Sequence, residues 1–177
     1  MRKLKNEELN RPDLDQFKES EKTPIVLVLD NVRSMHNVGS AFRTADAFAI
    51  ESIALCGITA QPPHREIHKT ALGATESVEW KHYKNTMEAC KSLRDEGYTL
   101  MAIEQVDDSI SLESFKPSVD QKLAVIFGNE VFGVEEEVVA FADNSIEIPQ
   151  FGTKHSLNIS VSIGVVLWDL VSKMRFG

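Results

Sequence analysis

The run IVLVL at residues 25–29 is continuously aliphatic and comes directly after Pro24. Strands that are apolar on both faces are typical of parallel sheets covered by helices on either side. A second run of this kind, LAVIF, occupies residues 123–127. The sequence therefore predicts a buried sheet that contains both runs.

Strands and helices are predicted to alternate outward from these two runs. Asn85 and Glu88 form an Asn-x-x-Glu variant of the capping box, and Gly97 ends the same helix. The alternation predicts an α/β fold, with a mostly parallel sheet flanked by helices. The other expected helices are about 38–49, about 134–142 and the C-terminal stretch, and the other expected strands are 52–56, 98–104 and 145–148.

Two segments do not follow this pattern. Residues 1–24 form a charged amphipathic segment in which Pro12 would kink or end a helix, and we place the main domain at 25–177. Residues 58–77 show no clear hydrophobic period and predict a long loop with at most one helical turn. Long loops in compact domains are usually functional.

The composition is typical of a globular protein, since 42% of the 177 residues are hydrophobic and 26% are charged. No apolar run is long enough to cross a bilayer, and the charged N-terminus lacks the apolar core of a secretory signal. Two cysteines supply neither a disulfide framework nor a four-cysteine zinc site. We expect a soluble, cytoplasmic, single-domain protein.

The net charge of −8, taken alone, argues against nucleic acid as a partner. The charge is unevenly distributed, however. Residues 76–147 carry a net charge of −10, whereas residues 31–75 and 148–177 carry net charges of +1 and +2. If the fold brings the last two stretches together, a locally basic face can attract a polyanion.

Three polar, glycine-containing clusters follow predicted strands or lie at their ends. They are NVRSMHNVGSAFRTADAF (31–48), IFGNEVFG (126–133) and IEIPQFGTKHSLNIS (146–160). Loops at the carboxyl ends of parallel strands form the ligand crevice of α/β proteins, so a shared site is predicted. No G-x-G-x-x-G follows the first strand, no Lys-Ser/Thr follows Gly133, and His64 and His68 lack the order and third ligand of a zinc site. These absences disfavour a dinucleotide-binding oxidoreductase, a phosphate-loop kinase and a metal centre.

In this order, the clusters resemble the three motifs of the SPOUT superfamily, specifically the SpoU/TrmH-type RNA ribose 2′-O-methyltransferases. No single motif is specific, but the ordered set is, and it extends over residues 25–172. Glycines at 128 and 133 would let a ligand approach the backbone closely. The matching residues are Asn37 and Arg43 in the first motif, Gly128, Glu130 and Gly133 in the second, and Ile148-Pro149 and Ser156-Leu157-Asn158 in the third.

The resemblance implies a SPOUT fold with a deep trefoil knot near the C-terminus, S-adenosylmethionine as the cofactor, and a homodimer whose interface includes the last helix. The substrate that it implies is a ribose 2′-hydroxyl in tRNA or rRNA, and it implies neither a metal ion nor a membrane. By position, the cofactor-binding residues are Ile103, Gly128, Ile148 and Leu157, and the expected RNA-binding residues are Arg33, Arg43, Arg65, Lys69 and Lys154.

Arg43 matches the residue that is proposed to activate the ribose hydroxyl in the family. Because a guanidinium stays protonated in proteins, we expect it to orient the RNA phosphate and stabilise the developing alkoxide instead of acting as a base. Asn37, Glu130, Ser156 and Asn158 are expected to supply the surrounding hydrogen bonds. A purely structural role at a helix start stays open for Ser156 and Asn158, as does a surface role for Arg43.

Two points stay open at this level. A noncatalytic RNA-binding homologue would keep the knot, although the presence of Arg43 and of an intact third motif favours an enzyme. Residues 157–164 alternate between apolar and small polar side chains, which by period alone predicts a strand. The resemblance implies a helix there, and we adopt the helix.

Overall fold

A computed structural model describes residues 1–177, apart from the side chain of Asn6. Its centre is a seven-stranded sheet in the order β3-β2-β1-β6-β4-β7-β5, and all neighbouring strands are parallel. The predicted α/β class with a parallel sheet is therefore confirmed. The strands are β1 (Thr23–Asp30), β2 (Ile50–Cys56), β3 (Glu79–Tyr83), β4 (Thr99–Ile103), β5 (Ile110–Ser111), β6 (Leu123–Phe127) and β7 (Asn144–Glu147).

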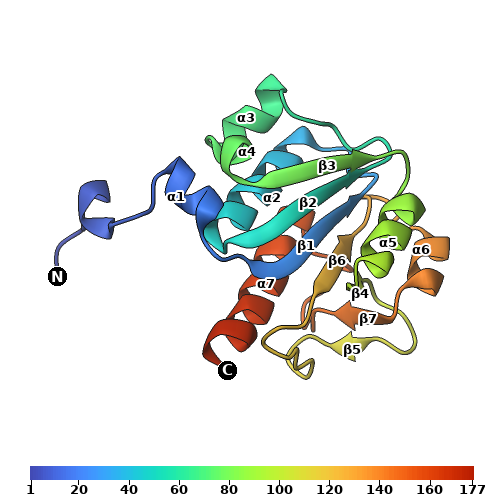
Figure 1. Cartoon of the computed structure of the whole chain (residues 1–177). Helices are drawn as coiled ribbons and strands as arrows, with labels where there is room; N and C mark the ends of the chain where they lie inside the picture. The colour runs from blue at the N-terminus through green and yellow to red at the C-terminus, as the bar shows by residue number, and fades with distance from the viewer.

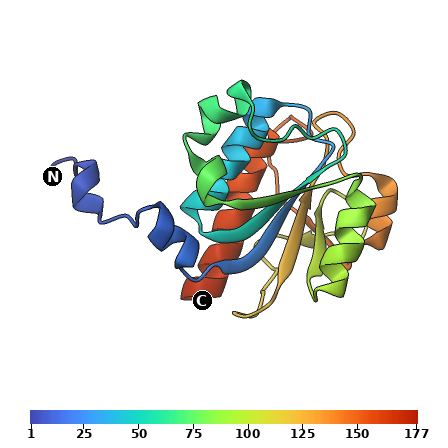
Figure 2. The same ribbon diagram turned by 45° about the horizontal axis from the view of Figure 1, so that its top comes forward.

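Helices cover both faces of the sheet (Figure 1). One face carries α2 (Met35–Ala47), α3 (Arg65–Ala71), α4 (Ala74–Ser77) and α7 (Ile159–Phe176), and the other carries α5 (Thr86–Asp95) and α6 (Glu136–Phe141). Figure 2 shows α2 running beside α7. The aliphatic run in β1 serves both layers. Ile25, Leu27 and Leu29 pack on the side of α2 and α7, whereas Val26 and Val28 pack on the side of α5 and α6.

The C-terminal stretch is a helix despite its alternating pattern. Ile159, Ile163, Val166 and Leu170 are buried, at the spacing of three to four residues that places side chains on one helical face. Asn158 caps this helix, because its Oδ1 accepts a hydrogen bond from the Ser160 amide at 2.9 Å. The helix implied by the resemblance is confirmed here, and the strand suggested by period is wrong.

The region 58–77 corrects the prediction of a long loop. It contains two short helices, α3 and α4, and the first is capped by His64, whose Nδ1 accepts from the Glu66 amide at 3.2 Å. Only Ile67 and Ala71 of α3 are buried, which is too few to produce a visible period. The helix lies close to α2 because α2 presents Gly39, where a Cβ would stand 2.3 Å from the Ile67 carbonyl oxygen.

Further differences lie at the edges of the fold. The polar strand β3 and the two-residue strand β5, which form the two edges of the sheet, were not predicted. Strand β1 begins at Thr23, two residues before the expected start. The N-terminal segment forms η1 (Asn6–Leu9) and α1 (Leu14–Glu19), with Pro12 between them, and its first residues extend away from the sheet (Figure 1). Among the described residues, no helix combines the length and the apolar character needed to cross a membrane.

Replacing Phe42 by Ala should lower the free energy of unfolding by about 3–5 kcal/mol, because this fully buried ring of α2 would leave a cavity in the core. Phe176→Ala is the matched control, since that ring is 78% exposed and its loss should change stability by no more than about 0.5 kcal/mol. Urea unfolding measures the change in the free energy of unfolding for both variants, provided that their m values equal that of the wild type. Equal midpoints for the two variants would contradict the described packing.

Candidate functional site

A cavity of about 540 Å³ lies at the carboxyl-end edge of the sheet, where the loops after β4, β6 and β7 meet the start of α7. These three strands are neighbours in the sheet, so the loops meet although they are distant in sequence. The volume is within the range of roughly 300–1,000 Å³ that is typical of small-ligand sites. The cavity is lined by residues 103–105, 127–133, 146–148, 150, 155–159 and 162.

The Glu130 carboxylate connects this cavity to the first turn of α2. Its oxygens accept hydrogen bonds from the Arg33 amide at 2.9 Å, the Ser34 amide at 2.9 Å and Asn37 Nδ2 at 3.0 Å. Asn37 itself is buried. The bonds join the first and second sequence clusters across 93 residues of chain, so the structure brings Asn37 and Glu130 together.

The hydrogen bonds also determine the charge of Glu130. Partial burial acts to raise the pKa of its carboxyl, but the bonds from the Arg33 and Ser34 amides and from Asn37 together outweigh it, and the pKa lies below its ordinary value. A carboxylate that accepts several donors favours its ionised form. Glu130 is therefore an ionised anchor at neutral pH and is poorly suited to take a proton there.

The turn after β6 is closed by its own backbone. Asn129 and Gly133 exchange two backbone hydrogen bonds of 2.8 and 2.9 Å. A Cβ at Gly128 would stand 2.0 Å from the Gly133 carbonyl carbon and 2.1 Å from the Val134 nitrogen. The expectation that the two glycines leave room for a ligand thus needs correction, because the space at Gly128 is filled by the chain itself.

Glu104, at the end of β4, holds the same turn from the other side. Its Oε2 accepts from the Val134 amide at 3.0 Å, and a Cβ at Gly133, whose φ is +72°, would stand 2.2 Å from that oxygen. Sequence reasoning did not select Glu104. The available signal was its position, since it is a carboxylate directly after a buried apolar strand.

The residues predicted to bind the cofactor all line the cavity. Ile103 ends β4, Gly128 follows β6, Ile148 follows β7 and Leu157 precedes α7. Ile103 and Ile148 also pack against the core on the α2 side of the sheet. Ile103, Ile148 and Leu157 therefore supply apolar lining, and Glu104 and Glu147 belong to the same lining.

Ser156 and Asn158 lie on the cavity wall with exposed side chains. Asn158 is the N-cap of α7, and its Oδ1 also accepts from Ser160 Oγ at 2.6 Å. The structural role left open for Asn158 therefore has direct support. Ser156 forms no hydrogen bond within the described part of the chain, so its hydroxyl is free to meet a ligand.

Arg43 lies outside the cavity of its own chain. Its side chain is exposed on α2 and, among the described residues, forms no hydrogen bond or ion pair with any other predicted site residue. Six residues along an α-helix correspond to about 9 Å of rise and about 240° of rotation, so Asn37 and Arg43 point in different directions. The helix turns Asn37 inward toward Glu130 and Arg43 outward.

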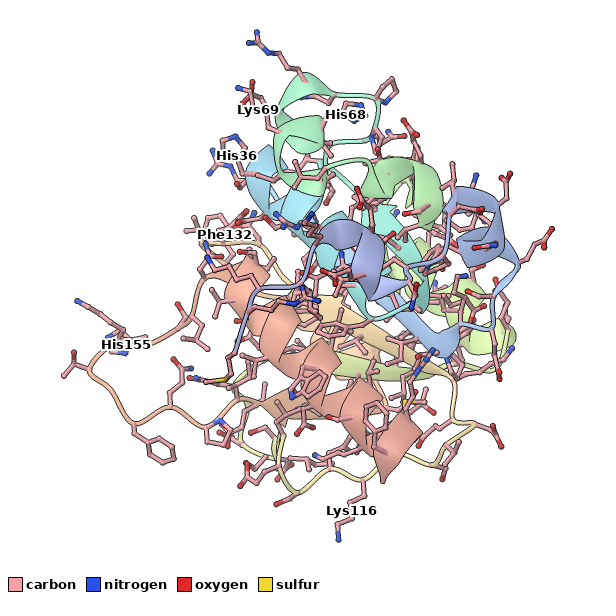
Figure 3. All side chains as sticks on the ribbon, turned by 90° about the vertical axis from the view of Figure 1, so that its left-hand side faces the viewer. His36, His68, Lys69, Lys116, Phe132 and His155 are labelled. Carbon is pink, nitrogen blue, oxygen red and sulfur yellow. The ribbon has the colours of Figure 1, made fainter. Side chains whose placement is uncertain are left out.

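The other predicted RNA-binding residues, Arg33, Arg65, Lys69 and Lys154, also have exposed side chains. Lys69 Nζ pairs with Glu66 Oε1 at 2.7 Å, and Glu66 Oε2 lies 3.1 Å from His36 Nε2. The bond from Lys69, together with His36, lowers the pKa of Glu66 despite partial burial. Figure 3 shows His36, His68 and Lys69 on the same side of the molecule as Phe132.

Asp30 is a second residue that sequence reasoning missed. It is fully buried at the end of β1 and accepts hydrogen bonds from the Thr86 hydroxyl, from Asn31 Nδ2 at 2.9 Å and from the Glu135 amide at 2.8 Å. These bonds attach the start of α5 and the loop before α6 to the central strand. A carboxylate that ends the run IVLVLD was the signal in the sequence.

Neither metal ions nor thiols are indicated at this site. Within the described part of the chain, no three His, Cys, Asp or Glu side chains are grouped to hold a metal ion. Cys56 and Cys90 are buried, and burial raises the pKa of both thiols, that of Cys90 to about 12. Buried thiols of this kind are inert as nucleophiles.

Comparison with known proteins gives consistent matches. The chain is 30% identical over 165 residues to tRNA (guanosine(18)-2′-O)-methyltransferase of Thermus thermophilus, covering 92% of this chain and 81% of that protein. It is 29% identical over 164 residues to 23S rRNA (guanosine-2′-O-)-methyltransferase RlmB of Vibrio parahaemolyticus, covering 93% of this chain but only 65% of that protein.

A solved structure shares the fold. The AdoMet-bound rRNA methyltransferase from Sinorhizobium meliloti superimposes with a TM-score of 0.79 at 24% identity, over 91% of this chain and 61% of that one. Residues 24–168 match the SpoU rRNA Methylase family, which is most of the chain. Together with the ordered motifs at the cavity, this match shows that the chain belongs to the SpoU methylase family.

Proposed function

We propose that this chain is an S-adenosylmethionine-dependent methyltransferase that modifies a ribose 2′-hydroxyl in tRNA or rRNA. The observation that carries the proposal is the joining of the motif clusters. The second and third build one cavity, and the Glu130–Asn37 bond attaches the first to it. The two curated relatives act on guanosines of tRNA and of 23S rRNA.

The residues at the cavity fit S-adenosylmethionine. The apolar side chains of Ile103, Ile148 and Leu157 suit an adenine ring, and the carboxylates of Glu104 and Glu147 suit a cofactor that carries sulfonium and ammonium charges. When bound, this cofactor supplies an electrophilic methyl group. The C-terminal trefoil knot implied by the motif resemblance stays a prediction.

The chain's own task is to activate a ribose hydroxyl, which is a poor nucleophile until its developing negative charge is stabilised. Glu130 is committed to three hydrogen bonds and positions the start of α2. A fixed cation is the group best suited to the developing alkoxide, and Arg43 is the candidate. Its guanidinium would also hold the adjacent phosphate through a planar pair of hydrogen bonds.

The outward position of Arg43 leads us to include a homodimer in the proposal. Val161, Val165 and Trp168 form an exposed apolar stripe on α7, and a Cβ at Gly164 in that region would meet no atom within 4 Å. The ring centroids of Trp168 and Phe48 are 5.9 Å apart, and Phe48 is the residue directly after α2. We infer that a second copy covers this stripe and that Arg43, exposed on α2 next to α7, acts on the cavity of that copy.

The cofactor proposal predicts that calorimetry finds one S-adenosylmethionine site per chain. Gly128→Ala should weaken that affinity by at least about tenfold, because its Cβ displaces the 133–134 backbone that forms the cavity wall. Gly152→Ala is the control, since a Cβ at Gly152 meets nothing within 4 Å, and it should bind normally. Saturable binding that is unaffected by Gly128→Ala would refute this account of the cavity.

Arg43→Ala should reduce methyl transfer by about 10²–10³-fold while leaving cofactor binding unchanged, because a positioned charge acts on the transition state. Arg43→Lys keeps the charge but loses the planar fork, so it should recover only part of the rate. Arg65→Ala should weaken RNA affinity and its salt dependence instead, with turnover retained. Single-turnover methylation at saturating RNA separates the three, and wild-type turnover in Arg43→Ala would exclude Arg43 as the activating residue.

Mixed dimers test whether Arg43 acts on the partner's cavity. At a cofactor concentration well below the Kd of Gly128→Ala, neither Arg43→Ala nor Gly128→Ala should transfer methyl groups alone at more than a small fraction of the wild-type rate. A heterodimer of the two variants has one intact cavity, and that cavity faces an intact Arg43 only if the arginine comes from the other subunit. We expect mixing to restore up to about half of the sites in each heterodimer, whereas no recovery would place Arg43 and the cavity in the same subunit.

Val165→Glu should dissociate the dimer, because it places a charge in the centre of the apolar stripe of α7. Val119→Glu is the control, as Val119 is also exposed but lies outside α7. Sedimentation at micromolar protein should give about twice the 19.8 kDa chain mass for the wild type and for the control. A wild-type mass near that of one chain, at every concentration, would rule the dimer out.

A further inference from the structure

Phe132 is an exposed aromatic side chain at the mouth of the cavity. It lies in the turn after β6, 84% of its surface is accessible, and it belongs to the cavity lining. Neither the core nor the proposed activation of the ribose uses it. Val131, beside it in the turn, is 66% exposed and also lines the cavity, so the two side chains form an exposed apolar patch at a candidate ligand site, which indicates a binding role.

The turn that carries Phe132 is fixed independently of the ring. Asn129 Oδ1 accepts from the Val131 amide at 2.9 Å and from the Phe132 amide at 3.2 Å. Asn129 Nδ2 donates to the Asn31 carbonyl at 2.8 Å, and the Asn129–Gly133 bridge closes the turn. The backbone of Phe132 is therefore ordered before any partner arrives, which lowers the entropic cost of binding through its side chain.

The side of the molecule that carries Phe132 also carries cationic and imidazole groups of α2 and α3. Glu130, in the same turn, holds the amides of Arg33 and Ser34 at the start of α2. On that helix His36 contacts Glu66, which also pairs with Lys69. Figure 3 shows Phe132 on the same side of the molecule as His36, Lys69 and His68. An aromatic ring on the same side of a protein as cationic and imidazole groups is a combination that binds single-stranded nucleic acid.

We propose that Phe132 stacks on a nucleobase of the substrate RNA, at or next to the nucleotide whose ribose enters the cavity. Proteins bind unpaired bases by stacking them on aromatic side chains, and an unstacked base beside the cavity needs such a surface. Phe132 lies in the turn after β6 and not on the apolar stripe of α7, and the sedimentation mass of its variants tests whether it also contributes to a dimer. This inference rests on the proposed RNA methyltransferase function and adds the residue that orients the substrate.

Binding of total tRNA by filter retention tests the inference, with Phe132→Ala, Phe132→Leu and Phe132→Trp compared with wild type. Stacking predicts a loss of about 5- to 100-fold in affinity for Ala, a similar loss for Leu, which is apolar but has no flat ring, and nearly wild-type affinity for Trp. Phe176→Ala, which removes an exposed ring at the end of α7, should bind normally. Sedimentation mass should be unchanged in all variants, and RNA binding measured without cofactor excludes an indirect effect through the cavity lining.

The kinetic test uses whichever tRNA or rRNA transcript the wild type methylates. On that transcript, Phe132→Ala should raise KM, while turnover at saturating RNA should stay within about threefold of wild type. The reason is that stacking stabilises the bound RNA and does not change the activation free energy of methyl transfer from the bound state. Unchanged tRNA affinity in Phe132→Ala overturns the inference. The inference is also overturned if Phe132→Leu binds tRNA as tightly as Phe132→Trp. It is overturned as well if a Phe132 variant becomes monomeric, because Phe132 would then contact a second copy of the chain. Absence of any wild-type methylation would instead count against the proposed function, while tRNA binding still decides the role of Phe132.

Discussion

The geometry of the site depends on the carboxylate of Glu130. Its three hydrogen bonds join the turn after β6 to the first turn of α2, so one side chain fixes the cavity wall, the buried Asn37 and the exposed start of α2 relative to one another. The bonds lower the pKa of the carboxyl against the opposing effect of burial. A group used in this way keeps its charge, and proton removal from a substrate must be assisted elsewhere.

The sequence predicted those parts of the fold in which every residue is constrained by burial. The runs at 25–29 and 123–127 lie in the central strands β1 and β6, which have helices on both faces, so both were recognisable. Strand β3 at the sheet edge is half solvated and reads EWKHY, which has no strong apolar signal. Helix α3 buries only Ile67 and Ala71, and its position depends on the missing side chain of Gly39, a tertiary contact that no local pattern encodes.

The candidate site was predictable in composition but not in geometry. The ordered motifs indicated which residues gather at the carboxyl ends of the strands, and the cavity contains most of them. Spacing along the chain could not show that Gly128 makes room for the chain's own backbone, or that Glu104 holds the turn. Nor could it show that Arg43 does not line its own cavity, because the direction of a side chain on a helix depends on what the helix packs against.

The distribution of charge reconciles an acidic chain with a polyanionic substrate. The net charge is −8, but a phosphate backbone near the surface responds to the groups within about one Debye length, roughly 8–10 Å at physiological salt. At the start of α2 and on α3, acidic side chains are already paired: Glu130 with backbone amides, and Glu66 with Lys69 and His36. Arg33, Arg43 and Arg65 are exposed around them. Pairing of Glu66 with Lys69 and engagement of Glu130 by backbone amides, more than an excess of lysine and arginine, therefore make this face compatible with the proposed RNA substrate.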